Sequence, residues 1–206
     1  MLQNSQAVEE AGLTFIDQNV GAHSFTPGQW AVVRQVIHAT ADFDFAREMV
    51  FHPAAVEAGL AAIRFGADIV ADAPTVEVGI VKDRLRKYGG TVWCFITDDD
   101  VVKKAKSESL PRAAVSMQKA AETSDGSIYV IGNAPTALLE LIRLVKEGKA
   151  KPSLIIGVPV GFIDAADSKE ALLGLSTPFI ACRGPKGGSP VAAAIVNALT
   201  LLAVQS

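Results

Sequence analysis

The sequence predicts an α/β fold: a single domain with a mostly parallel central sheet flanked by helices and preceded by two N-terminal helices. Six short β-rich runs alternate with amphipathic segments from about Met49 onward, which is the pattern of a parallel α/β sheet. Hydrophobic residues make up 50% of the chain but aromatic residues only 6%, so Ala, Val, Ile and Leu must build the interior. Parallel strands that are buried on both faces have this composition.

Length and charge limit the class of protein. The 206 residues suffice for one large domain with its own core, and no linker or low-complexity segment divides them, so we expect one domain over residues 1–206. The net charge of -3 and the lack of a long basic run argue against nucleic-acid binding. No apolar run approaches the ~20 residues that cross a bilayer. The N-terminus lacks the features of a signal peptide, and we expect a cytoplasmic protein without membrane contact.

Two helices are predicted before the sheet. The first covers about residues 5–19, and the second begins at Thr26-Pro27, with Thr26 as N-cap and Pro27 as the first helical residue. Apolar residues at helical spacing along the second helix are Trp30, Val33 and Ile37.

The six predicted strands are the runs MVFH, ADIVAD, TVWCFIT, SIYVIGN, SLIIGVP and PFIACRG. Residues 98–123 look helical, but Pro111 should break that helix near Leu110. The acidic run at residues 98–100 opens this segment, and we interpret it as N-terminal capping rather than as a metal cluster. Cys94 and Cys182 lie inside strand runs and are expected to be buried, reduced thiols.

Loops that leave the carboxyl ends of parallel strands share one edge of the sheet, where helix N-termini point their free N–H groups. The unusual residues of this chain lie in four such loops, which are DAPT (72–75), IGNAPT (131–136), GVPVGF (157–162) and RGPKGGS (183–189). Gly, Asn and Pro are also ordinary turn residues, so one loop alone indicates little. Together the four loops predict one cleft.

The loop at residues 183–189 combines two cations, Arg183 and Lys186, with a Gly-Gly-Ser sequence that opens the last helix. A helix N-terminus carries partial positive charge, so this loop suits a carboxylate or a phosphate. It lacks the spacing of the phosphate loop and of the dinucleotide fingerprint. Spacing alone therefore predicts a generic anion site.

Among the three histidines, His23 and His52 are expected to have structural or solvated roles. His38 shares a helix face with Arg34 and Asp42, four residues away on either side, which can orient its ring and adjust its charge. An imidazole in that setting can exchange a proton near neutral pH. A surface charge cluster would have the same spacing, so both interpretations stay open here. The hydrolase motifs Gly-x-Ser-x-Gly and HExxH are absent from the sequence.

Four segments occur in a characteristic order: VIHA around His38, IGNAPTAL (131–138), GVPVGFIDAADSKEAL (157–172) and RGPKGGSPVAAAIVNAL (183–199). From about residue 10 onward the chain resembles the precorrin-8X methylmutase family. The resemblance implies an α/β homodimer and an isomerase that moves a methyl group from C11 to C12 of the tetrapyrrole (cobalt-)precorrin-8X by a 1,5-sigmatropic rearrangement. The product would be hydrogenobyrinic acid or cobyrinic acid in cobalamin (vitamin B12) biosynthesis.

The resemblance also assigns residues. The catalytic histidine of the family matches His38, whose implied role is to protonate a ring nitrogen, and its substrate arginine matches Arg112. No cofactor is expected, because the shift occurs within one conjugated system and any cobalt belongs to the substrate. The candidate substrate-binding residues are Arg112, Gly132, Asn133, Thr136, Arg183, Lys186, Gly188 and Ser189.

Two features depart from the family. A hydroxyl residue is usual about 26 positions before the histidine, whereas this chain has Gly12 there, with Thr14 nearby, and Pro111 directly precedes Arg112. One alternative is a corrinoid or tetrapyrrole carrier without isomerase activity, which would not need His38. The other is an unrelated α/β enzyme for a phosphate ligand, against which the missing phosphate motifs count.

Overall fold

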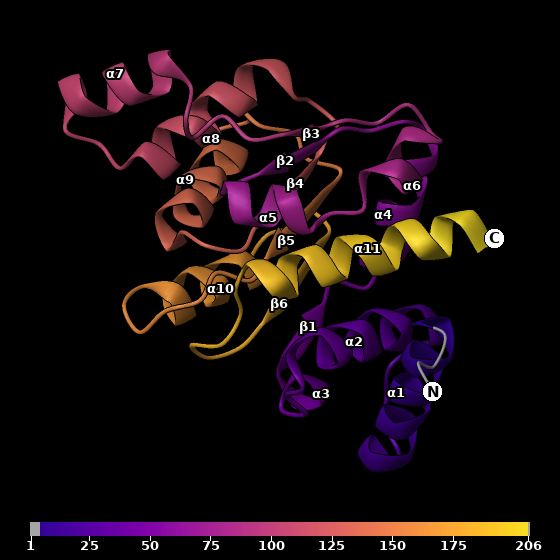
Figure 1. Cartoon of the computed structure of the whole chain (residues 1–206). Helices are drawn as coiled ribbons and strands as arrows, with labels where there is room; N and C mark the ends of the chain where they lie inside the picture. Colours follow the sequence, from indigo (N-terminus) through magenta and orange to yellow (C-terminus); the bar gives the residue numbers. More distant parts are fainter. Residues whose placement is uncertain (1–4, 206) are drawn as a thin grey trace.

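The computed structural model describes residues 5–205 and contains one six-stranded sheet of order β1-β6-β5-β4-β2-β3, with helices on both faces (Figure 1). The strands are β1 (Met49–Phe51), β2 (Ile69–Ala71), β3 (Val92–Trp93), β4 (Ile128–Ile131), β5 (Leu154–Gly157) and β6 (Phe179–Cys182). Every neighbouring pair is parallel except β1 with β6. The predicted mostly parallel sheet is confirmed, and the one antiparallel pair arises because β1 enters the sheet at its edge and runs against β6.

The described helices are α1 (Ser5–Val20), α2 (Pro27–Thr40), α3 (Phe45–Glu48), α4 (Ala55–Arg64), α5 (Pro74–Gly79), α6 (Lys82–Arg86), α7 (Asp99–Glu108), α8 (Arg112–Thr123), α9 (Pro135–Lys146), α10 (Ala165–Leu173) and α11 (Ser189–Gln205). Strand side chains alternate between two cores. In β4, Ile128 and Val130 face the core shared with α4 and α11, whereas Tyr129 and Ile131 face the core shared with α8 and α9. Burial on both faces explains the near-continuous apolar strands.

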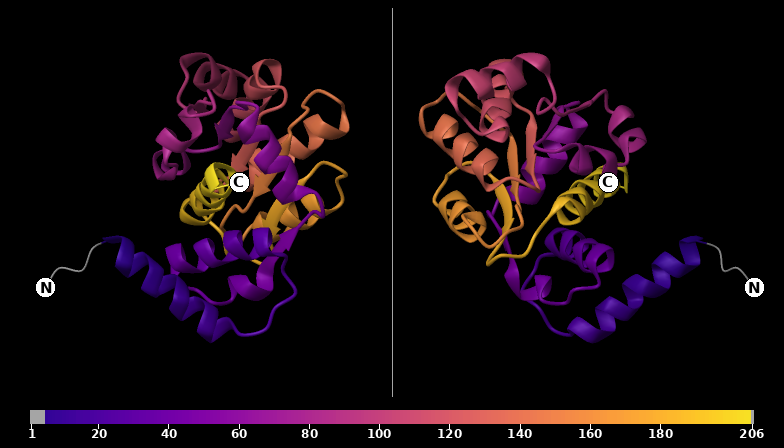
Figure 2. Two further views of the ribbon diagram at one scale, coloured as in Figure 1. Left: turned by 90° about the vertical axis from the view of Figure 1, so that its right-hand side faces the viewer. Right: turned by 60° about the vertical axis from the view of Figure 1, so that its left-hand side comes forward.

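The N-terminal helices form an outer layer. α2 packs against α11 on the side away from the sheet, and α1 lies beyond α2 (Figure 2). The predicted start of α2 is confirmed, because Thr26 and Gln29 form a reciprocal capping box with Pro27 in the first turn. The helix ends at Thr40, where Ala41 adopts a left-handed conformation with φ 53°.

The break at Pro111 is confirmed, since α7 ends at Glu108 and α8 begins at Arg112. The acidic run opens α7 as predicted, with Asp99 and Asp100 in its first turn, but the predicted side-chain cap is not formed. Asp98 occupies the N-cap position of α7 without a side-chain capping bond, and Asp98 and Asp100 instead pair with Lys119 at 2.7 and 2.8 Å. Among the described residues no group of His, Cys, Asp and Glu has the arrangement of a metal site.

The two cysteines are free thiols, but only Cys182 is buried as expected. Cys94 is half-buried, and it follows β3, which ends at Trp93, instead of lying within the strand. Within residues 5–205 no helix is long and apolar enough to span a membrane.

Candidate functional site

The four predicted loops meet at the carboxyl edge of the parallel strands. The hydroxyl groups of Thr75 and Ser189 lie 2.8 Å apart, and the N–H of Gly188 donates to the carbonyl of Val158 at 2.8 Å. A cavity of ≈ 610 Å³ opens between them and is lined by residues of every loop, among them Thr75, Asn133, Val160, Gly188 and Ser189. The predicted single cleft is therefore confirmed.

Asp72 holds the 131–136 loop in place. Its side chain is wholly buried, and its carboxylate accepts the N–H groups of Gly132, Asn133 and Ala134 at 2.9, 2.9 and 2.7 Å. Burial raises the pKa of this carboxyl, and the three hydrogen bonds oppose the rise. The backbone N–H groups of residues 132–134 thus already donate to a carboxylate of the protein itself. Asp72 belongs to a loop predicted to line the cleft but was not among the predicted site residues, and the available signal was an acidic residue at the end of a strand.

Gly132 has a packing role. A Cβ atom there would lie 2.7 Å from the Cβ of Ala192 and 2.9 Å from Cγ2 of Val76. The missing side chain lets the loop fit between α5 and α11. Asn133 is exposed beside it and lines the cavity.

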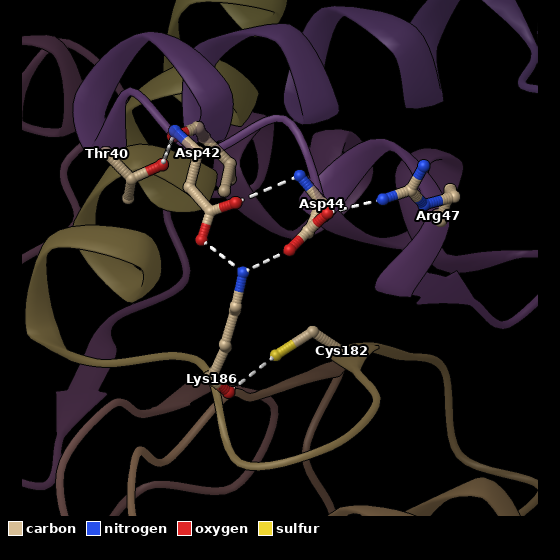
Figure 3. A network of polar contacts seen from close by, with 7 residues as sticks. Thr40, Asp42, Asp44, Arg47, Cys182 and Lys186 are labelled. Atoms are coloured by element: carbon tan, nitrogen blue, oxygen red, sulfur yellow. Dashed lines mark hydrogen bonds and ion pairs between the residues drawn. The ribbon is translucent and has the colours of Figure 1, made fainter.

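The two cations of the 183–189 loop differ in their surroundings. The Arg183 side chain is 64% exposed, and its nearest carboxylate partner, Glu170, lies 3.7 Å from Nε. Lys186 is fully engaged, since Nζ lies 2.6 Å from carboxylate oxygens of both Asp42 and Asp44 (Figure 3). Those carboxylates raise the pKa of Lys186. Only Arg183 is therefore available as a nearly free cation of this loop.

His38 lies exposed in the last turn of α2, but not in the predicted charge cluster. Arg34 pairs with Asp17 of α1 at 3.0 Å, and Asp42 lies past the helix end, where it binds Lys186. The predicted shared face is wrong for Asp42, because the left-handed residue after Thr40 ends the helix before it, whereas Arg34 does lie one turn before His38 in α2. His38 makes no hydrogen bond or ion pair with a described residue, and its ring lies against Gly12.

The other two histidines are held by the protein, as expected. His23 stacks on Trp30 with ring centroids 4.1 Å apart, and Nδ1 of His52 accepts the N–H of Ala54 at 3.2 Å. His23 also lines a cavity of ≈ 850 Å³ between α1, the following loop and α3, together with Phe25, Phe43 and Arg47. This cavity was not predictable from the sequence, since its walls come from segments without motif spacing.

Arg112 is the exposed first residue of α8, and within residues 5–205 its guanidinium has no ion-pair partner. Thr136 is half-buried in the first turn of α9. In the part of the chain that the structure describes, neither the cleft at the sheet edge nor the cavity beside α1 is lined by Arg112, Thr136 or His38. The structure thus unites Asn133, Gly188 and Ser189 in the cleft, and it connects the end of the His38 helix to the same loop through Lys186.

Fold and site together define an α/β protein with a cleft at the carboxyl edge of its parallel strands and, on an outer helix, an imidazole that pairs with none of residues 5–205. The family model described as precorrin-8X methylmutase matches residues 7–202. The chain belongs to the precorrin-8X methylmutase family.

Individual relatives agree with this membership. A cobalt-precorrin-8 methylmutase of Priestia megaterium is 51% identical over 96% of this chain and 88% of its own length. A precorrin-8X methylmutase of Pseudomonas aeruginosa is 43% identical over 80% of each chain. The solved structure of the precorrin-8X methylmutase of Thermus thermophilus superposes with a TM-score of 0.90 at 40% identity, over 97% of this chain and 98% of that chain.

Proposed function

We propose that this chain is an isomerase that moves a methyl group from C11 to C12 of precorrin-8X or its cobalt form. The product is hydrogenobyrinic acid or cobyrinic acid, an intermediate of cobalamin biosynthesis. The observation that carries the proposal is the imidazole of His38, which is exposed and has no hydrogen-bond or ion-pair partner among residues 5–205, in a chain whose relatives are methylmutases along nearly its whole length. An exposed imidazole that no described residue engages can donate to a ligand.

In the proposed reaction, the His38 imidazolium donates its proton to a ring nitrogen of the macrocycle. Protonation makes the conjugated system more electron-poor, which favours migration. The bond between the methyl group and C11 breaks as the bond to C12 forms, and the proton then returns to His38. A positioned acid of this kind contributes roughly 10²–10⁴-fold to the rate. The shift occurs within one conjugated system, so the proposal includes no cofactor, and any cobalt is part of the substrate.

The acetate and propionate groups of the substrate need cations and N–H donors. Arg112 and Arg183 supply exposed guanidinium groups, which bind carboxylates through paired hydrogen bonds. Asn133, Gly188 and Ser189 line the cleft, where the N-terminus of α11 favours negative charge. Thr136, in the first turn of α9, is also assigned to the residues that bind the substrate.

The test is optical, because a methyl shift alters the conjugation of the macrocycle. Purified protein is mixed with metal-free and with cobalt-containing precursor, and the visible spectrum is followed over time. Conversion of at least one precursor supports the isomerase and identifies which form is used. A spectral shift on binding without conversion would instead indicate a carrier.

We further propose a homodimer located in the cytoplasm. Phe162 and Ile163 are 99% and 80% exposed, which is unusual for neighbouring apolar side chains and suits a subunit contact. The free thiols of Cys94 and Cys182 suit a reducing compartment. Sedimentation at micromolar concentration should give a dimer, and Phe162→Ser should weaken it. A stable wild-type monomer would contradict the dimer.

A further inference from the structure

Lys186 joins the cleft to the helix that carries His38. Its ammonium group bonds to Asp42 and Asp44, and Asp42 also accepts the N–H of Asp44 at 2.9 Å (Figure 3). The N–H of Asp42 donates to the hydroxyl of Thr40 at 3.3 Å, and that hydroxyl donates to the carbonyl of Val36 within α2. A continuous set of hydrogen bonds therefore runs from the loop into the last turns of α2.

The backbone of Lys186 is fixed as well. Its carbonyl oxygen accepts Nζ of Lys169 at 2.5 Å and the thiol of Cys182 at 3.2 Å. Lys169 is only 1% exposed, and burial lowers the pKa of its ammonium group. A buried amine requires hydrogen-bond partners, and among the described residues Nζ of Lys169 bonds, besides this carbonyl, only to the sulfur of Cys182, at 3.7 Å. Displacement of the Lys186 carbonyl would therefore remove the shorter of these two contacts of a buried charge.

The charges around Lys186 do not favour a substrate carboxylate. The two aspartates at 2.6 Å carry two negative charges, and Arg47, which pairs with Asp44, brings the four side chains to a balance of two cations and two anions. A carboxylate that approached Nζ would meet Asp42 and Asp44 at close range and be repelled.

We propose that Lys186 is a positioning residue rather than a carboxylate ligand. It keeps the 183–189 loop, with Arg183 and Ser189, in fixed register with α2, so that a substrate bound at the loop meets His38 in one orientation. This role rests on the proposed isomerase function. Misplacement of a reacting group by a small distance lowers the rate far more than it lowers affinity.

A double-mutant cycle tests the proposal. We expect Lys186→Met and Asp42→Asn each to lower kcat by about tenfold while the product Kd changes less than about twofold. The double variant should be no slower than Lys186→Met, because both changes break the same contact, the ion pair between Lys186 and Asp42. Lys186→Arg, which keeps a cation that pairs with both aspartates, should recover most of kcat. The control on the same loop, Arg183→Met, should instead weaken product binding.

The proposal is overturned if Lys186→Met weakens product binding by about tenfold and Asp42→Asn does not, since Lys186 would then touch the substrate itself. Additive losses in the double variant overturn it too. If the wild-type protein converts no precursor, the isomerase proposal fails, and the nitrogen NMR signals of His38 decide about Lys186. They should move alike in Lys186→Met and Asp42→Asn, and stay in place in Arg183→Met. Unmoved signals in the first two variants overturn the positioning role.

Discussion

The backbone of Gly12 in α1 lies directly against the imidazole of His38 in α2. A methyl group at position 12 would lie 2.9 Å from Cε1 and 3.0 Å from Nδ1 of the ring, which is closer than such atoms pack. This is the position at which the family resemblance implies a hydroxyl residue. In this chain the ring is therefore placed by a close contact with a helix backbone and not by a side-chain hydrogen bond at this position.

Gly12→Ala should push the His38 ring aside and lower kcat by about tenfold, with little change in product affinity. The fold should tolerate the change, because Ala stabilises a helix relative to Gly by roughly 0.5–1 kcal/mol. Gly174→Ala is a suitable control, since its added Cβ meets only the carbonyl of Ala171 at 3.6 Å. Steady-state rates and product titrations on both variants provide the measurement. Unchanged turnover in Gly12→Ala would show that this ring orientation is not the reactive one.

His38→Ala should remove most turnover, roughly 10²–10⁴-fold, and leave affinity nearly intact, because proton donation stabilises chiefly the transition state. Arg112→Met and Arg183→Met should show the opposite pattern. Each loses a charge-assisted pair that contributes about 1.5–3 kcal/mol, or roughly ten- to a hundredfold in affinity.

Single-turnover kinetics and equilibrium titration with product separate these roles. If His38→Ala keeps wild-type turnover while binding collapses, His38 is a binding residue and the acid mechanism is wrong.

Asp72→Ala should lower the free energy of unfolding by about 2–3 kcal/mol, because it leaves the buried N–H donors of residues 132–134 without their acceptor. Urea denaturation measures the change. Product affinity should fall as well, since Asn133 loses its fixed position in the cleft. Asp167→Ala, in the exposed first turn of α10, is the control and should change neither quantity. Normal stability in Asp72→Ala would mean that the loop finds other acceptors.

Local patterns in the sequence predicted most of the fold. The start of α2 follows from Thr26 and Pro27, and the break before α8 follows from Pro111, because each signal acts within a few residues. The cleft followed from topology, since loops after parallel strands share one edge. The antiparallel direction of β1 at the sheet edge could not be predicted from the sequence, because β1 has the same β-rich composition as the parallel strands.

Contacts between distant segments were not predictable from spacing. Lys186 and Asp42 are 144 positions apart, and Asp72 reaches an amide 60 positions away. Helical spacing suggested that Asp42 would lie beside His38, but a single left-handed residue, Ala41, turned it toward Lys186. A tertiary partner therefore decided the role of a residue that local periodicity had assigned elsewhere.

The contact between Lys186 and Asp44 should make stability depend on pH in a definable direction. The hydrogen bond and charge of Lys186, followed by those of Arg47, lower the pKa of Asp44 from its ordinary value of 3.8. A carboxyl group whose pKa is lower in the folded protein than in the unfolded chain stabilises the fold at pH values above its unfolded pKa. That contribution disappears as the pH falls through the lowered folded value.

The difference in the free energy of unfolding between the wild-type protein and Lys186→Met should therefore stay constant from neutral pH down to about 4 and shrink below it. Urea denaturation at a series of pH values measures this difference, and added salt should reduce it because these side chains are partly exposed. Lys119→Met is the matched control, since Lys119 also binds two aspartates and lowers the pKa of Asp100. The control should show the same pH trend while kcat stays at the wild-type value. A difference for Lys186→Met that persists in acid would show that Lys186 stabilises the fold through its aliphatic stem and not through its charge.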